Sequence, residues 1–234
     1  MNPWHGYPVP ALRHEALYGD RVVPCFAERP KSLHALFANS LTRRPSAQAL
    51  VFEGQRWTYA QCEAISARLA AGLAAQGVSR GERVVMFIDN RPEFFFTLLA
   101  LARLGAIAVP VGVREQRPGL AYIARQCGAM ALIAEAALAE RVPDASDAPE
   151  LRLRMVVGAA TGFMSLDALM HGDAQAPPVA DVPETGVAVI LYTSGTTGKP
   201  KGAMLAHCNI IHSAMVFESC LKLTEADRDR KSVV

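Results

Sequence analysis

The chain has 234 residues, of which 51% are hydrophobic and 20% are charged, and its formal net charge is +2. This length and apolar content are enough for a buried core, which excludes an intrinsically disordered protein. The small net charge, without a block of basic residues, argues against nucleic acid as a partner.

The five cysteines are widely and irregularly spaced, without a CxxC pair. This spacing argues against a disulfide framework or a zinc site and indicates reduced thiols, so we expect a cytoplasmic protein. We expect no signal peptide, because a basic region followed by an apolar one is lacking. The apolar stretch at 94–113 is not expected to span a membrane, because Arg103 at its centre would cost about 2.5–3.5 kcal/mol there.

Residues 1–30 contain five prolines, and we predict that they form an extended arm lying over the rest of the chain. Helical and strand patterns then alternate. The expected elements are a helix capped by Ser32 that ends before Pro45, a hairpin of strands at 49–52 and 56–59, a helix from the Thr58–Gln61 capping box to Gly77, a strand at 83–88, a helix from an Asn90 cap to Gly105, a strand at 106–111, a helix at 120–127, a strand at 130–134, a short helix at 135–141, a strand at 154–157 and a helical turn at 166–170.

Strands that are apolar throughout and alternate with helices are typical of a parallel sheet with helices on both faces. The expected fold is therefore α/β, with residues 31–171 as a first lobe. Residues 172–185 are aperiodic and rich in proline, which predicts a surface linker.

Residues 186–234 would then begin a second lobe, with an apolar strand at 187–192, a returning strand at 203–205 and a helix at 208–221. The first strand and the helix carry more apolar side chains than the remaining sequence can cover. We therefore expect the chain to be a truncated part of a larger domain that does not naturally end at Val234.

The segment at 192–202 reads YTSGTTGKPKG and combines glycine, hydroxyl and lysine side chains. Its glycines are expected to take positive φ, so that the backbone can come close to a ligand. Hydroxyls and backbone N–H groups can donate to phosphate oxygens, and a hydrogen bond to a charged group contributes about 1.5–3 kcal/mol. Pro200 excludes a Walker A motif. The candidate phosphate-binding residues are Thr193, Ser194, Gly195, Thr196, Thr197, Gly198, Lys199, Lys201 and Gly202.

This segment resembles, residue for residue, the phosphate-loop signature of the adenylate-forming superfamily: acyl-CoA synthetases, amino-acid adenylation domains and luciferases. Residues 57–111 are similar to the first sheet-and-helix unit of acyl-CoA synthetases, with landmarks at 90–93 and 104–110. Val109 stands where amino-acid adenylation domains commonly have tyrosine, which favours an acyl-CoA synthetase. A ligand-free glycine-rich turn is the alternative, which an ordered match of this length disfavours.

The resemblance implies ATP-dependent activation of a carboxylic acid, with a fatty acid preferred, to an acyl-adenylate and then to a coenzyme A thioester, assisted by Mg²⁺. Thr196 and Thr197 would contact phosphate oxygens, and Lys201 would neutralise their charge. The family's catalytic lysine, hinge and adenine- and magnesium-binding motif have no counterpart here, so we expect no catalytic residue and no metal ligand among these residues. The expected partners are a nucleotide, a carboxylic acid and a missing C-terminal half. The alternative is a non-catalytic remnant that binds a nucleotide or a partner.

Overall fold

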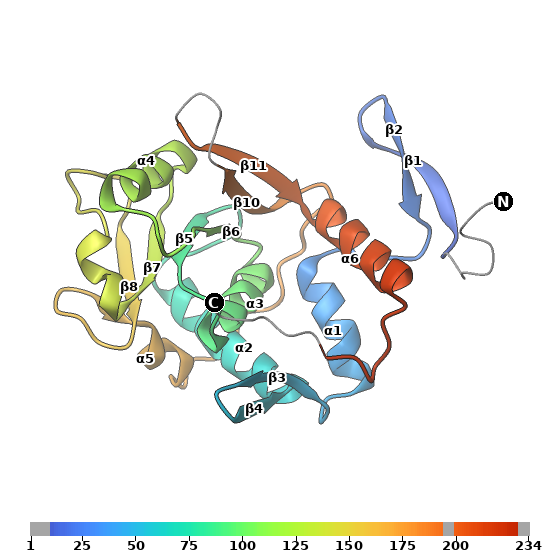
Figure 1. Ribbon diagram of the computed structural model, residues 1–234, viewed down its shortest axis with the longest axis horizontal. Coiled ribbons are helices and arrows are strands. Elements are labelled where there is room, and N and C mark those ends of the chain that lie inside the picture. The colour runs from blue at the N-terminus through green and yellow to red at the C-terminus, as the bar shows by residue number, and fades with distance from the viewer. Residues whose placement is uncertain (1–9, 194–198, 229–234) are drawn as a thin grey trace.

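The computed structural model describes residues 10–193 and 199–228. Within these residues, seven strands form one sheet in the spatial order β11-β10-β6-β5-β7-β8-β9, at the centre of the molecule in Figure 1. The strands are β5 (Arg83–Phe87), β6 (Ile107–Pro110), β7 (Ala131–Glu135), β8 (Leu153–Val157), β9 (Met164–Ser165), β10 (Val187–Thr193) and β11 (Lys201–Ala206). Neighbouring strands are parallel except β10 and β11, so the predicted α/β fold is confirmed.

Helices cover both faces of this sheet. They are α2 (Tyr59–Ala75), α3 (Pro92–Leu104) and α5 (Leu166–Met170) on one face, and α4 (Arg117–Cys127) and the 3₁₀ helix η1 (Ala136–Arg141) on the other. The side chains of β5 show why both layers are needed. Val84 and Met86 belong to the core under α2 and α3, whereas Val85 and Phe87 belong to the core under α4. A strand that is apolar on both sides is stable only between two such layers.

Local capping signals position the first helices as predicted. α1 (Leu33–Arg43) begins after Ser32, whose hydroxyl caps its first turn. α2 begins at the predicted capping box: the backbone N–H of Gln61 donates to the Thr58 hydroxyl at 3.2 Å, and the Gln61 side chain accepts the backbone N–H of Thr58 at 2.8 Å. The predicted hairpin between these helices consists of β3 (Gln48–Phe52) and β4 (Gln55–Thr58).

The predicted start of α3 is wrong by one residue. Arg91, not Asn90, occupies the N-cap position, and the backbone N–H of Asn90 bonds the Asp89 carboxylate at 2.7 Å. Pro92 stands in the first turn, where its fixed φ suits the helix and its missing N–H leaves no donor unpaired. The helix ends at Gly105 with φ of 66°, as predicted.

Two further boundaries differ from the sequence-based expectation. α4 begins at Arg117, three residues before the predicted start, because Pro118 suits a first helical turn as Pro92 does in α3. The short helix expected at 135–141 is present as a 3₁₀ helix that begins one residue later, at Ala136, and ends at Arg141 as expected.

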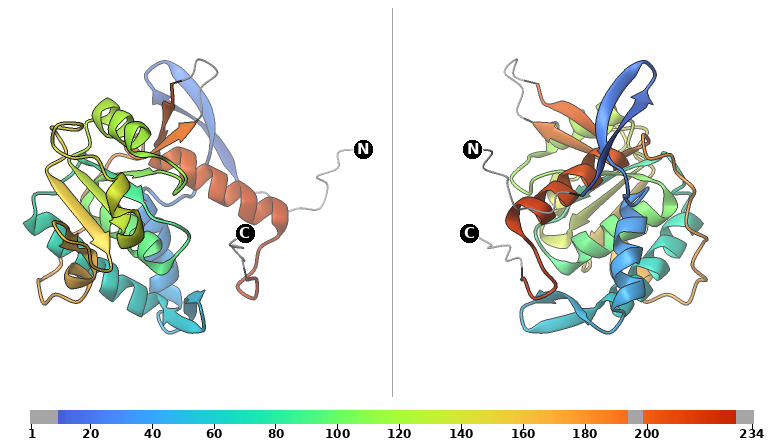
Figure 2. Two further views of the ribbon diagram at one scale, coloured as in Figure 1. Left: turned by 60° about the vertical axis from the view of Figure 1, so that its left-hand side comes forward. Right: turned by 90° about the vertical axis from the view of Figure 1, so that its right-hand side faces the viewer.

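The N-terminal segment differs most from its prediction. In place of an extended arm, β1 (Leu12–Tyr18) and β2 (Arg21–Phe26) form an antiparallel sheet of their own. This hairpin stands beside α6 (His207–Leu221), and both views in Figure 2 show it projecting from the body of the molecule. Pro24 lies within β2, and a two-stranded sheet tolerates proline because both of its strands are edge strands.

Arg29 fixes the N-terminal hairpin to the rest of the chain. Its side chain is only 2% exposed and donates to both carboxylate oxygens of Glu184, at 2.8 and 2.9 Å. It also donates to both carboxylate oxygens of Glu15, at 2.7 and 2.9 Å, and to the carbonyl oxygen of Phe26 at 2.7 Å. The hydrogen bonds from Arg29, and then from Arg13, lower the pKa of Glu15 to about 2. Glu15 therefore remains ionised at neutral pH.

The predicted linker at 172–185 contains neither helix nor strand. The segment contacts the end of α3 in space, since the backbone N–H of Ala180 donates to the carbonyl oxygen of Arg103 at 2.8 Å. The next strand, β10, pairs with β6 in the same sheet as the preceding strands. The division into lobes at 31–171 and 186–234 stays a prediction.

α6 leaves part of its apolar surface exposed. Phe217 and Leu221 are 61% and 63% exposed, whereas Ile211 is fully buried. The further layer that the sequence leads us to expect over this helix stays a prediction. No helix within the described ranges combines the length and the apolar content needed to cross a bilayer.

Candidate functional site

The glycine-rich segment lies on the hairpin formed by β10 and β11. In this antiparallel pair Tyr192 lies opposite Gly202, and Thr193 lies opposite Lys201. β10 runs parallel to β6, with Val189 opposite Ala108, so its carboxyl end is at the same edge of the sheet as the carboxyl ends of β5, β6 and β7. This edge is the usual place for a ligand in an open α/β sheet.

The structure brings two of the predicted phosphate-binding residues together at the base of the segment. Thr193 and Lys201 form the last pair of the hairpin, and both are exposed, as is Lys199. Residues 194–198, which carry the predicted Ser194, Gly195, Thr196, Thr197 and Gly198, lie outside the described residues. The predicted contacts of these five residues therefore stay predictions.

Gly202 does not adopt the positive φ expected from the sequence, and its role is steric instead. A Cβ atom there would lie 2.8 Å from Cγ2 of Ile190 and 3.1 Å from Cζ of Tyr192. Real Cβ atoms almost never come as close as 2.8 Å, so a larger residue would collide with Ile190. Glycine also leaves room for the Tyr192 ring. The requirement for glycine comes from the facing strand and not from the backbone conformation.

Tyr192 also reaches the helix that covers this part of the sheet. Its hydroxyl donates to Oε1 of Gln126 on α4. Burial, and then the neighbouring Cys127 and Tyr122, raise the pKa of Tyr192 to about 12. The phenol is therefore protonated at neutral pH and can act as the donor. Tyr192 was predicted only as a residue of the motif, without this role, and no local signal in the sequence indicated Gln126.

A cavity of about 250 Å³ opens at the same edge, beside the ends of β5 and β6. Its lining includes Asp89, Asn90, Phe94, Pro110 and Gly112. The backbone N–H of Asp89 donates to Oε1 of Glu135 at 2.8 Å, which ties the end of β5 to the end of β7. In the sequence, residues 90–93 were recognised only as part of the similarity to acyl-CoA synthetases. Their position directly after a parallel strand was the signal for a cavity.

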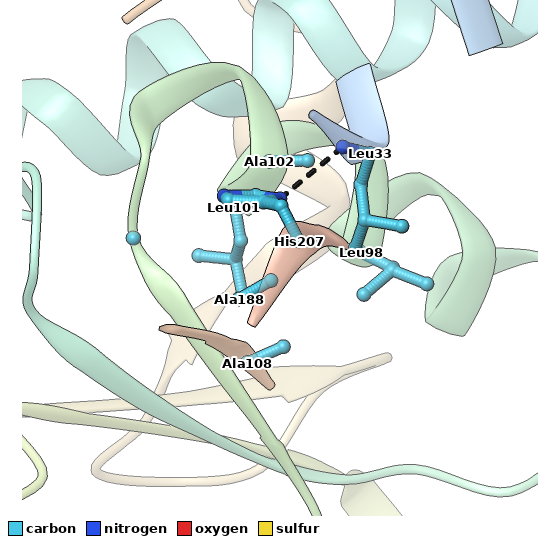
Figure 3. Close-up of a pocket in the computed structure, with 8 residues that line it drawn as sticks. Leu33, Leu98, Leu101, Ala102, Ala108, Ala188 and His207 are labelled. Carbon is cyan, nitrogen blue, oxygen red and sulfur yellow. Dashed lines mark hydrogen bonds between the residues drawn. The ribbon is translucent and has the colours of Figure 1, made fainter. Parts of the chain in front are cut away.

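His207 follows β11 but faces away from this edge. Because β11 is antiparallel to β10, His207 lies at the amino end of β10, where the backbone N–H of Leu33 donates to its Nδ1 at 3.2 Å (Figure 3). Leu98, Leu101 and Ala188 surround the ring, and burial lowers its pKa. The neutral ring joins the starts of α1 and α6 and is not placed to act on a ligand at the opposite edge.

Comparison with known proteins identifies the family. The sequence model described as "AMP-binding enzyme" matches residues 37–233, most of the chain. The chain belongs to the AMP-binding enzyme family. The match includes the hairpin β10–β11 and the whole seven-stranded sheet.

The similar proteins carry different names. The chain is 36% identical over 190 residues to a feruloyl-CoA synthase of Streptomyces sp, which covers 81% of this chain and 36% of that protein. It is 28% identical over 198 residues to tyrocidine synthase 1 of Brevibacillus parabrevis, covering 85% of this chain and 17% of that protein. Among solved structures, a long-chain-fatty-acid-CoA ligase from Archaeoglobus fulgidus superposes with a TM-score of 0.77 at 25% identity, over 86% of this chain and 41% of that one. This chain thus spans well under half of each of these proteins.

Proposed function

We propose that this chain is the phosphate-binding part of an AMP-forming acid–thiol ligase. Such an enzyme joins a carboxylic acid to the α-phosphate of ATP, with release of pyrophosphate, and then transfers the acyl group to the thiol of coenzyme A. The observation that supports the proposal best is the glycine-rich segment, in a member of this family, on a hairpin that ends at the carboxyl edge of the sheet. We propose the cytoplasm as its location, which the five free cysteines suit.

The exposed Lys201 and Thr193 fit a phosphate ligand. The two residues are paired through their backbones, and within the described residues neither the Lys201 amine nor the Thr193 hydroxyl has a side-chain partner, so both can donate to phosphate oxygens. Ser194, Thr196, Thr197 and the backbone between Gly195 and Gly198 would add further donors. Donors held in this way stabilise the negative charge that develops on the departing pyrophosphate.

We propose that Mg²⁺ reaches this site bound to the phosphate oxygens of ATP. Among residues 10–193 and 199–228, no three His, Cys, Asp or Glu side chains lie together as metal ligands. Mg²⁺ bound to phosphate oxygens would supply additional positive charge beside that of Lys201. The protein's own contribution at the base of the hairpin would be the cation of Lys201 and the hydroxyl of Thr193.

Coenzyme A is favoured over a peptide-synthetase carrier as the acceptor. The chain is more similar to the feruloyl-CoA synthase, at 36% identity, than to tyrocidine synthase 1, at 28%. Val109 in β6 also departs from the tyrosine common in amino-acid adenylation domains. The named relatives include ligases of aromatic and of fatty acids, so the fatty acid favoured by the sequence is one of two classes to test.

Calorimetric titration with MgATP tests the phosphate site. Lys201→Ala removes a hydrogen bond to a charged group and should weaken binding by about 10- to 150-fold, and Thr196→Ala by less. Arg56→Ala is the matched control, since Arg56 is an exposed cation on β4, away from this edge. Equal affinity of wild type and Lys201→Ala would refute the assignment.

A second candidate function is nucleotide binding without turnover. The observation that favours it is that these 234 residues hold no counterpart of the family's catalytic lysine. Acid-dependent release of pyrophosphate, measured with fatty, aromatic and amino acids, separates the two. We expect MgATP binding but no release from the isolated chain, and robust release would establish the ligase directly.

A further inference from the structure

We propose that Tyr192 is the positioning residue of the phosphate-binding hairpin, holding its base against α4 through Gln126 and against β11 through Gly202. The inference rests on the proposed function, since it concerns how the base of the hairpin presents Thr193 and Lys201. It assigns to Tyr192 a task that is separate from contact with the ligand.

The end of the hairpin needs such a support because it extends past its neighbour in the sheet. With Val189 opposite Ala108, the register places Leu191 beside Pro110, the last residue of β6. Tyr192 and Thr193 therefore lie beyond the end of that strand. Backbone hydrogen bonds to β6 cannot hold Tyr192 and Thr193 in place.

The Tyr192 side chain supplies this attachment in two directions. Its ring lies over Gly202 on β11, where an added Cβ would approach the ring to 3.1 Å. Its hydroxyl donates to Gln126 at the end of α4. α4 is itself firmly seated, because Leu120 and Ile123 are buried in the core beneath it. The phenol thus connects the overhanging strand end to a fixed helix.

Fixing Tyr192 fixes the next pair of the hairpin, Thr193 and Lys201. Thr193 directly follows Tyr192 in β10, and Lys201 directly precedes Gly202 in β11. A shift of about 1 Å in ligand-binding groups is enough to reduce their effect strongly. Loss of the hydrogen bond between Tyr192 and Gln126 should therefore weaken phosphate binding although neither side chain touches the phosphate.

The test is calorimetric titration of the full chain with MgATP, alongside a thermal melt. Tyr192→Phe and Gln126→Met each remove the hydrogen bond and should weaken MgATP binding by about two- to tenfold. The double variant should be no weaker than either single variant, because both lose the same interaction. Gln126→Glu keeps an oxygen acceptor and should retain affinity close to wild type, and Tyr59→Phe, at the start of α2 on the other face of the sheet, is the matched control.

Each outcome is decisive. If Lys201→Ala weakens binding while Tyr192→Phe and Gln126→Met do not, the positioning role is refuted and the phosphate site stands. If the losses in affinity add in the double variant, or follow the melting temperature and occur equally in Tyr59→Phe, the effect is general destabilisation and the inference is wrong. If Lys201→Ala also has no effect, the proposed phosphate site fails and the inference fails with it.

Discussion

Two antiparallel hairpins project from the body of this protein, and they are anchored in opposite ways. The N-terminal hairpin β1–β2 is held by a buried cation, Arg29, whose charge is neutralised by Glu15 and Glu184. The hairpin β10–β11 is held by a neutral ring and a phenol, those of Tyr192. In the described part of the chain its cations, Lys199 and Lys201, make no ion pair. A cation that is neutralised by carboxylates serves to hold the structure together. A cation without an ion pair can bind an anionic ligand.

The largest expected effect tests the charged anchor. Arg29→Met leaves two partly buried carboxylates with only the exposed Arg13 and Lys31 as cationic partners, and we expect a loss of about 3 kcal/mol in the free energy of unfolding. Chemical denaturation measures it. Arg13→Ala is the control: Arg13 also pairs with Glu15, at 2.6 Å, but its side chain is 53% exposed. Its loss should be below about 1 kcal/mol. Equal effects of the two substitutions would mean that the buried Arg29 stabilises the hairpin no more than the exposed Arg13 does.

A second substitution tests the neutral anchor. Gly202→Ala places a methyl group against Ile190 and the Tyr192 ring, and overpacking of this kind costs about 1–3 kcal/mol. Gly112→Ala is the matched control, because an added Cβ at Gly112 meets no atom within 4 Å. Denaturation of both variants decides whether the glycine is needed for space. A stable Gly202→Ala variant would show that the ring is not held as described.

The smallest expected effect separates the N-terminal hairpin from the start of α6 by pH. Burial lowers the pKa of His207, so below pH 6.5 the unfolded chain takes up a proton that the folded chain resists, and stability falls as the pH decreases. The pKa of Glu15 is about 2 in the folded chain, so its contribution is complete above about pH 4.5 and is lost only as the pH falls towards 2.

Amide hydrogen exchange between pH 7.5 and 5 measures this difference, after correction for the intrinsic rates. Protection at Leu33, whose N–H bonds His207, should decrease over this range, while protection in β1 and β2 should change less. His207→Gln should flatten the pH dependence at Leu33. An equal decrease in both regions would mean that the contact between His207 and Leu33 and the hairpin β1–β2 do not respond to pH separately.

The sequence predicted those features whose causes lie within a few neighbouring residues. The capping box of Thr58 and Gln61 and the left-handed end of α3 at Gly105 depend on short-range contacts. The all-apolar β5 indicated a sheet covered on both faces. The position of the glycine-rich segment after an apolar strand was predictable for the same reason.

The features that the sequence did not predict depend on distant partners. The hairpin β1–β2 is anchored by Arg29 and Glu184, which are 155 residues apart. The steric role of Gly202 depends on the facing strand, and the bond of Tyr192 with Gln126 spans 66 residues. No periodicity or capping rule links such pairs. Asn90 is a different case, since two adjacent residues can compete for a helix cap and Pro92 decided the outcome.

The ion pair between Arg29 and Glu184 also sets an order of events during synthesis. Arg29 leaves the ribosome 155 residues ahead of its second carboxylate. At translation rates of about 5–20 residues per second, this is a delay of roughly 8–30 s. During that time Arg29 has only Glu15 as a carboxylate partner, so β1 and β2 cannot be locked in place. The hairpin β1–β2 is therefore fixed only after the chain has been made as far as Glu184, next to the start of the strand that leads to the glycine-rich segment.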